Sequence, residues 1–301
     1  NILRTHSDSN SSLERVVWAY NGDKKGTSIS IDGFTSIATN SYASSSNSDD
    51  IAIAAGTATN LDSDKVSYSK EHLKYEDRAK VILTYDDFTN STTGTSIKSS
   101  ISGDILAAYE GYVDISPKSN SSGIEITGNL LAGNNGILNV NLGCGGTLTG
   151  RADDYGDAGV ITDDNGEAIN GHSSYEFFNP AFSSTIFEGG AVNLTMGQGS
   201  VWNVTGQSWI TSITTNSEIM ALDDDTSSDD SNSIHYVHGL PIINMVSATS
   251  NLNSAANALT VYEFNGDAVF NMNLDGNNLE NSNMLYIKQA NGTYYINLVD
   301  A

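Results

Sequence analysis

Residues 191–213 decide the fold, and they read Ala-Val-Asn-Leu-Thr-Met-Gly-Gln-Gly-Ser-Val-Trp-Asn-Val-Thr-Gly-Gln-Ser-Trp-Ile-Thr-Ser-Ile. Apolar side chains alternate with short polar ones in 192–196 and again in 201–204, which is typical of a β-strand with one buried face. Gly197 and Gly199 interrupt this alternation, and Gly206 interrupts it again before a third apolar run. Three short strands separated by tight corners predict one coil of a parallel β-helix.

The rest of the chain repeats a unit of this coil, in which a polar residue lies between two apolar ones. The centres of these units lie at 114, 139, 193, 244, 271 and 297, so the steps are 25, 54, 51, 27 and 26 residues. These steps are close to one or two multiples of about 26, which indicates a solenoid, because a single coil cannot bury its apolar face alone. The two long steps predict further rungs near Val160–Ile161 and Ile219–Met220. The sequence therefore predicts an all-β parallel β-helix.

Three stretches break the pattern and are expected to protrude as loops. They are residues 62–80, which are rich in charged residues, and the acidic stretches 151–187 and 222–233. Insertions in a solenoid collect on one face, which is often the binding face. We expect the β-helix to occupy 1–257 and a final segment to occupy 258–301.

The candidate ligand-binding residues fall into two groups. In the repeated units the flanking apolar side chains point inward, so the central polar side chain points outward. Stacked about 4.8 Å apart, outward amides can form a hydrogen-bonded ladder. Such a ladder either only stabilises a polar outer face or also docks another chain or a glycan. The outward candidates are Asp114, Asn139, Asn193 and Asn244, and the loop candidates are Lys65, Lys74, Arg78, Asp153, Asp154, Asp157 and Asp163.

Charge and cysteine content narrow the classes of partner. The chain has 36 acidic and 13 basic residues and a net charge of −23, which argues against a nucleic acid partner, because phosphates need a basic face. The single cysteine, Cys144, cannot form an intramolecular disulfide and is expected to be a small buried residue. Asp163, Asn165 and Glu167 only partly resemble a calcium loop. We therefore predict neither a metal ion nor a cofactor.

The sequence offers no clear catalytic constellation. A Gly-x-Ser-x-Gly nucleophile motif is absent, and no pair of carboxylates stands out from the general acidity. Basic residues are too scattered for a lyase that acts on an acidic polysaccharide. We predict that the protein is not an enzyme, with a polysaccharide-cleaving enzyme as the less favoured alternative.

Residues 190–301 resemble a known family. Trp202-x-Val204-Thr205-Gly206-x-Ser208, followed by Ile213, is similar to the W-x-V-T-G-x-S-x-x-x-L element near the end of the passenger domains of type V autotransporters of Gram-negative bacteria. The family's later elements have counterparts in the stretches 259–266, 270–272 and 292–299. The sequence departs from the family at Asn283, where an aspartate is usual.

This resemblance implies a right-handed, three-faced parallel β-helix that is exported and displayed at the bacterial cell surface or outer membrane. It implies that 258–301 is a C-terminal stem that assists folding, and that a C-terminal translocator barrel follows in the full-length protein. The adhesin branch of the family fits best, because no Gly-Asp-Ser-Gly protease site is present. The expected partner is a host extracellular matrix protein or glycosaminoglycan. Self-association between cells, giving aggregation and biofilm, is the alternative.

Overall fold

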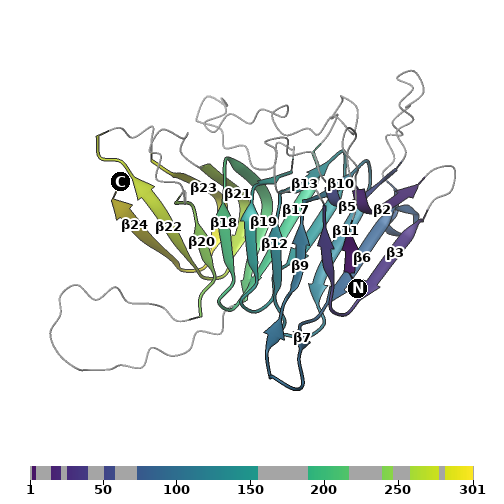
Figure 1. Ribbon diagram of the computed structural model, residues 1–301. Helices are drawn as coiled ribbons and strands as arrows, with labels where there is room; N and C mark the ends of the chain where they lie inside the picture. The colour runs from purple at the N-terminus through teal and green to yellow at the C-terminus, as the bar shows by residue number, and fades with distance from the viewer. Residues whose placement is uncertain are drawn as a thin grey trace, which may run out of the picture.

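The computed structural model describes residues 2–4, 15–21, 26–39, 51–57, 73–154, 189–216, 239–246, 258–277 and 282–300. Within these residues the protein is all-β, with strands β1 to β24 and one 3-10 turn at Tyr75–Asp77. The strands stack into an elongated parallel β-helix, with β2 and β3 at one end and β24 at the other (Figure 1). None of the described residues belongs to a helix that could cross a membrane.

Three parallel sheets, which we call faces A, B and C, form the walls of this β-helix. Face A has the order β1 (Ile2–Arg4), β4 (Ser36–Ala38), β9 (Ser99–Ser102), β12 (Ile124–Thr127), β15 (Thr147–Gly150), β18 (Val201–Val204), β20 (Ile242–Asn244), β22 (Ala268–Leu274) and β24 (Tyr294–Asp300). Face B has the order β16 (Ala152–Asp153), β13 (Leu130–Gly133), β10 (Asp104–Ala108), β5 (Ile51–Thr57) and β2 (Arg15–Asn21). Face C has the order β23 (Met284–Asn291), β21 (Ala258–Asn265), β19 (Ser208–Asn216), β17 (Ala191–Gly197), β14 (Ile137–Asn141), β11 (Tyr112–Pro117), β6 (Lys80–Tyr85) and β3 (Ser28–Asp32).

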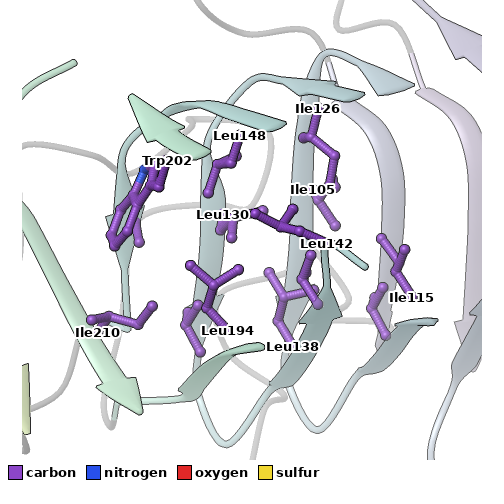
Figure 2. Close-up of a cluster of buried hydrophobic side chains, with 14 of the residues drawn as sticks. Ile105, Ile115, Ile126, Leu130, Leu138, Leu142, Leu148, Leu194, Trp202 and Ile210 are labelled. Carbon is purple, nitrogen blue, oxygen red and sulfur yellow. The ribbon is translucent and has the colours of Figure 1, made fainter. Parts of the chain in front are cut away.

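The core lies between the three faces and is continuous along the stack. Alternate residues of each strand are buried, as in β14, where Leu138 and Val140 point inward. Figure 2 shows side chains from successive coils, among them Leu130, Leu194 and Trp202, meeting in the interior. Full burial of one such side chain contributes roughly 1.5–3 kcal/mol. The alternation that defines the strands in the sequence is therefore also what holds the coils together.

The repeat predicted from the sequence is confirmed in its period, but it belongs to two separate columns. On face C, residue 114 pairs with 139 and 139 with 193. Asn244 does not continue this column, because β20 lies on face A, where Asn244 pairs with Asn203 on one side and Asn271 on the other. On both faces the repeated unit places an inward apolar residue on each side of an outward polar one. The sequence pattern therefore combined units of faces A and C into a single series.

The two predicted missing rungs are wrong. On face C, β14 pairs directly with β17, and on face A, β15 pairs directly with β18. No further strand therefore lies between the members of either pair. Likewise the strand that follows β17 on face C is β19, at Ser208–Asn216, rather than one near 219–220. The step from 139 to 193 reflects a long connection between adjacent coils, and the step from 193 to 244 joins residues of different faces; a count of residues distinguishes neither from two regular coils. Residues 160–161 and 219–220 lie outside the described residues.

The coil changes its shape along the stack. From β9 to β16 each coil places one strand on each face, and among the described residues β16 is the last strand of face B. The last two described coils have one strand on face C and one on face A, and they repeat at 26 residues, since Leu259 pairs with Leu285 and Phe270 with Ile296. The three-faced architecture thus gives way to a two-stranded coil within 258–300.

Two local features differ from the sequence analysis. Outside the three stretches that were expected to protrude, an antiparallel hairpin of β7 (Phe88–Thr89) and β8 (Ser96–Ile97) also projects from the stack (Figure 1). The loop expected at 151–187 begins later than predicted, because Ala152–Asp153 still forms β16. The remaining residues 155–187, the segment 62–72 and the loop 222–233 lie outside the described residues.

Candidate binding surface

An outward ladder of polar side chains runs along face C. Tyr112 Oη donates to Asp114 Oδ2 at 3.0 Å, and Asn139 Nδ2 donates to Tyr112 Oη at 3.0 Å. On the next two coils Asn193 Nδ2 donates to Asn139 Oδ1 at 2.9 Å, and Ser212 Oγ donates to Asn193 Oδ1 at 2.7 Å. The ladder predicted from the sequence therefore exists, and it links three of the outward candidates.

A second ladder runs along face A. Asn203 Nδ2 donates to Thr149 Oγ1 at 3.1 Å, and Asn244 Nδ2 donates to Asn203 Oδ1 at 3.2 Å. Further along the face, Asn297 Nδ2 donates to Asn271 Oδ1 at 3.2 Å. An amide carries two N–H donors, and these bonds use one of them on each donating asparagine. The second N–H of each half-buried amide is therefore available at the surface.

The chemistry of the face C ladder is set by Tyr112. Burial, together with the negative charge of Asp114, raises the pKa of its phenol to about 12. The phenol therefore stays protonated at neutral pH, donates to the carboxylate and accepts from Asn139 at the same time. This places every ladder contact between Asp114 and Ser212 in one unbroken chain of hydrogen bonds.

The basic candidates, Arg78, Lys74 and Lys65, differ in how the structure places them. Arg78 is buried: its Nη2 lies 2.7 Å from Glu110 Oε2, and its Nη1 donates to the backbone carbonyl of Asn135 at 2.7 Å. Its guanidinium is therefore committed to holding two corners of the coil and is not offered to a ligand. Lys74 is exposed just before the 3-10 turn, and Lys65 lies outside the described residues.

Of the four acidic loop candidates, the structure describes two, and both are buried. Asp153 and Asp154 are fully buried at the end of face B, and Asp154 Oδ2 accepts a hydrogen bond from Thr211 Oγ1 at 2.8 Å. These two residues belong to the wall of the β-helix rather than to a protruding loop. Asp157 and Asp163 lie outside the described residues.

The structure also shows a groove that the sequence did not indicate. It has a volume of about 380 Å³ and follows the corner where the chain turns from face C to face A. Its walls come from the ends of β11, β14, β17 and β19 and from the turns that follow the first three. Its lining residues are Pro117, Asn120, Asn141, Gly143, Cys144, Gly197, Gln198 and Asn216. Cys144 is half-buried in this lining, so the expectation of a buried core cysteine is wrong.

Hydrogen bonds between successive turns fix the shape of the groove. The amide N–H of Cys144 donates to Ser122 O at 3.0 Å, and that of Gly145 donates to Gln198 O at 2.8 Å. Ser122 Oγ in turn donates to Asp86 Oδ1 at 2.7 Å. Because the contacts are between backbones, the turns are positioned independently of any ligand.

Tyr85 supports the groove from inside the core. Its side chain is fully buried, and its phenol donates to the backbone carbonyl of Asn141 at 2.8 Å. Burial raises the pKa of this phenol well above its ordinary value, and the nearby charge of Asp87 adds to the rise. A protonated Tyr85 thus holds the end of β14 in place.

The groove is polar but uncharged. None of the eight lining residues carries a charge, although the chain as a whole carries −23. Within the described residues, no hydrogen bond uses the side-chain amide of Asn120, Gln198 or Asn216. The groove therefore presents amide donors and acceptors together with the apolar surfaces of Pro117 and Cys144.

In the part of the chain that the structure describes, no group of three or more His, Cys, Asp or Glu side chains is placed to hold a metal ion. Comparison of the chain with protein-family models, curated proteins and solved structures gave no match.

Proposed function

We propose that this chain is a bacterial cell-surface adhesin, exported to the outer membrane, that binds a host matrix protein or glycan through the outer faces of its β-helix. The observation that carries the proposal is the pair of outward ladders on faces A and C. They extend along successive coils and leave polar hydrogen-bonding groups in straight rows on the surface. A binding role uses such an extended surface, whereas catalysis needs a few convergent groups in a pocket.

The placement of the basic residues bears on the kind of ligand. With Arg78 engaged by Glu110, the described part of the 62–80 stretch offers Lys74 as a candidate for an anionic partner. The net charge of −23 repels polyanions at long range. These features favour a matrix protein or a weakly charged glycan over a glycosaminoglycan.

Self-association between cells is the second candidate. The same ladders bear on it, because stacked outward amides can hydrogen-bond to those of a second copy.

The test is to display the chain on a non-adherent bacterium. Retention on surfaces coated with fibronectin or heparin, measured against an uncoated surface, supports host adhesion and reports the ligand class. Clumping of the displaying cells in suspension supports self-association. Absence of both results rejects the proposal, and release of reducing ends from a polysaccharide by the purified chain points to the enzyme alternative.

A further inference from the structure

We propose that the groove at the corner between faces C and A binds a short neutral oligosaccharide. This inference rests on the proposed adhesin function, whose ligand class it narrows. The groove is separate from both ladders, and none of its lining residues was a sequence candidate. Its size, charge and polar groups each restrict what can occupy it.

The dimensions fit a chain of a few sugar rings. The groove spans the ends of four neighbouring strands of face C, β11, β14, β17 and β19. Three strand spacings of about 4.8 Å give a length of about 14 Å along the stack. The volume of about 380 Å³ lies at the lower end of the range of roughly 300–1,000 Å³ found for small-molecule sites. An extended oligomer matches this shape better than a single compact ligand.

The charge distribution favours a neutral ligand. The eight lining residues that the structure describes are uncharged, so they offer no cation to pair with a sulfate or carboxylate. The basic side chains nearest the turns are already engaged: Lys98 Nζ donates to the backbone carbonyl of Gly145, and Lys118 Nζ lies 3.1 Å from Asp32 Oδ2. Placing an anion there would leave its charge unpaired in a strongly acidic protein.

The polar groups match sugar hydroxyls. A hydroxyl is at once a donor and an acceptor, and a side-chain amide offers both functions within one planar group. Asn120, Gln198 and Asn216 come from three different coils, so they can contact successive rings. The apolar surface of Pro117 and the thiol of Cys144 face the same space and suit the C–H surfaces of a ring.

The backbone of the groove is already in place without a ligand. Gly143 has φ +66°, and a Cβ there would lie 2.0 Å from Ser122 O, so the turns are packed in direct contact. Binding would therefore order only the exposed amide side chains, which limits the entropy lost. A preformed site of this kind can bind a small ligand with measurable affinity.

The single cysteine provides the test. The native chain is treated with iodoacetamide, and carbamidomethylation of Cys144 is followed by mass spectrometry with and without each of three neutral probes: maltotriose, mannotriose and lacto-N-neotetraose. A ligand in the groove slows the reaction by a factor of one plus [ligand]/Kd, about tenfold at ten times Kd. A heparin hexasaccharide is the charged comparison and is expected to give no protection. A neutral-glycan array run in parallel covers other sugars.

Two variants link protection to the amides. Gln198→Ala and Asn216→Ala each remove one exposed amide and are expected to weaken binding of the protecting glycan about fivefold, the effect of one hydrogen bond. Gln289→Ala removes an equally exposed amide from β23 on the same face, outside the groove, and is expected to leave binding unchanged. Equal thermal melting of the three variants shows that the fold is intact.

The outcomes separate this inference from the proposed function. Binding by no neutral glycan, or protection that is as strong in both groove variants as in the native chain, overturns the groove as a site. Adhesion of displaying cells that continues in both groove variants also overturns it and leaves the adhesin proposal standing. Glycan binding by the pure chain without any cell adhesion supports the groove and rejects the adhesin function.

Discussion

The sharpest prediction concerns Arg78, which the sequence offers as a ligand contact and the structure buries. Its side chain is 10% exposed and that of Glu110 is 11% exposed, and their closest atoms are 2.7 Å apart. Arg78→Met removes the cation and leaves the carboxylate of Glu110 buried without it. Breaking a buried pair in this way costs about 3–5 kcal/mol. Glu110→Gln, which isolates the guanidinium instead, is expected to cost a similar amount.

The double variant distinguishes the pair from its parts. In Arg78→Met, Glu110→Gln no unpaired charge remains, and the main loss is the hydrogen bond from Arg78 to the carbonyl of Asn135. Losing one hydrogen bond from a charged donor to this half-buried residue costs roughly 1.5–3 kcal/mol. The double variant should therefore be more stable than the sum of the single variants implies, with a coupling of at least about 2 kcal/mol.

The assay is urea unfolding followed by far-ultraviolet circular dichroism, with the midpoint and slope compared among the four proteins. The slope must stay constant for the free energies to be comparable. An unchanged midpoint in Arg78→Met would refute the reasoning, because it would mean that the guanidinium is solvated. If Arg78→Met lost ligand binding with its stability unchanged, Arg78 would instead be a surface residue that contacts the ligand.

Three further outcomes follow from contacts described above. Asn193→Ala breaks two ladder hydrogen bonds at a half-buried site and is expected to lower the unfolding free energy by about 1–2 kcal/mol in urea titrations, whereas Gln289→Ala should have no effect. The pKa of Tyr112 is raised to about 12 in the folded state and is about 10 in the unfolded state. The protonated phenol therefore contributes fully to the stability of the fold below about pH 10, and this contribution is lost as the pH rises towards 12. In a plot of unfolding free energy against pH, Tyr112→Phe should lack the loss of stability between about pH 10 and 12. Gly143 and Gly199 share a φ of +66°, but only at Gly143 would a new Cβ meet a carbonyl oxygen, at 2.0 Å. Thermal melts should therefore show that Gly199→Ala lowers the unfolding free energy by about 1–2 kcal/mol and that Gly143→Ala lowers it clearly more.

The architecture was predictable because alternation and repetition are both local signals. The gapless match between 136–143 and 190–197 gives the register in which Asn139 pairs with Asn193. What the sequence could not supply is the face on which a repeat lies. Asn193 and Asn203 have the same neighbours in the sequence pattern, yet they belong to faces C and A, because the turn between them sets the face.

The candidate site was predicted less well, and the reason differs from residue to residue. Asn139 and Asn193 were found because strand alternation states which side chains point outward. Arg78 and Asp154 were misplaced because charged residues next to breaks in a pattern look solvent-exposed, and their partners Glu110 and Thr211 are remote in the sequence. The groove has no sequence signature, since its residues come from four separate coils. The turn glycines at 143, 197 and 199 were the available signal, because glycines allow backbones to approach closely.

The direct pairing of β14 with β17 has a consequence for how this molecule can change over evolutionary time. Asn139 and Asn193 are adjacent although 54 positions separate them, whereas Asp114 and Asn139 are adjacent at a separation of 25. Closing the longer connection costs only about 0.7 kcal/mol more than closing the shorter one, because the entropy of closure grows with the logarithm of length. Whole segments can therefore be gained, lost or exchanged at such a junction while the neighbouring rungs keep their alignment. The outside of the molecule can in this way diverge between related chains while the scaffold beneath stays the same.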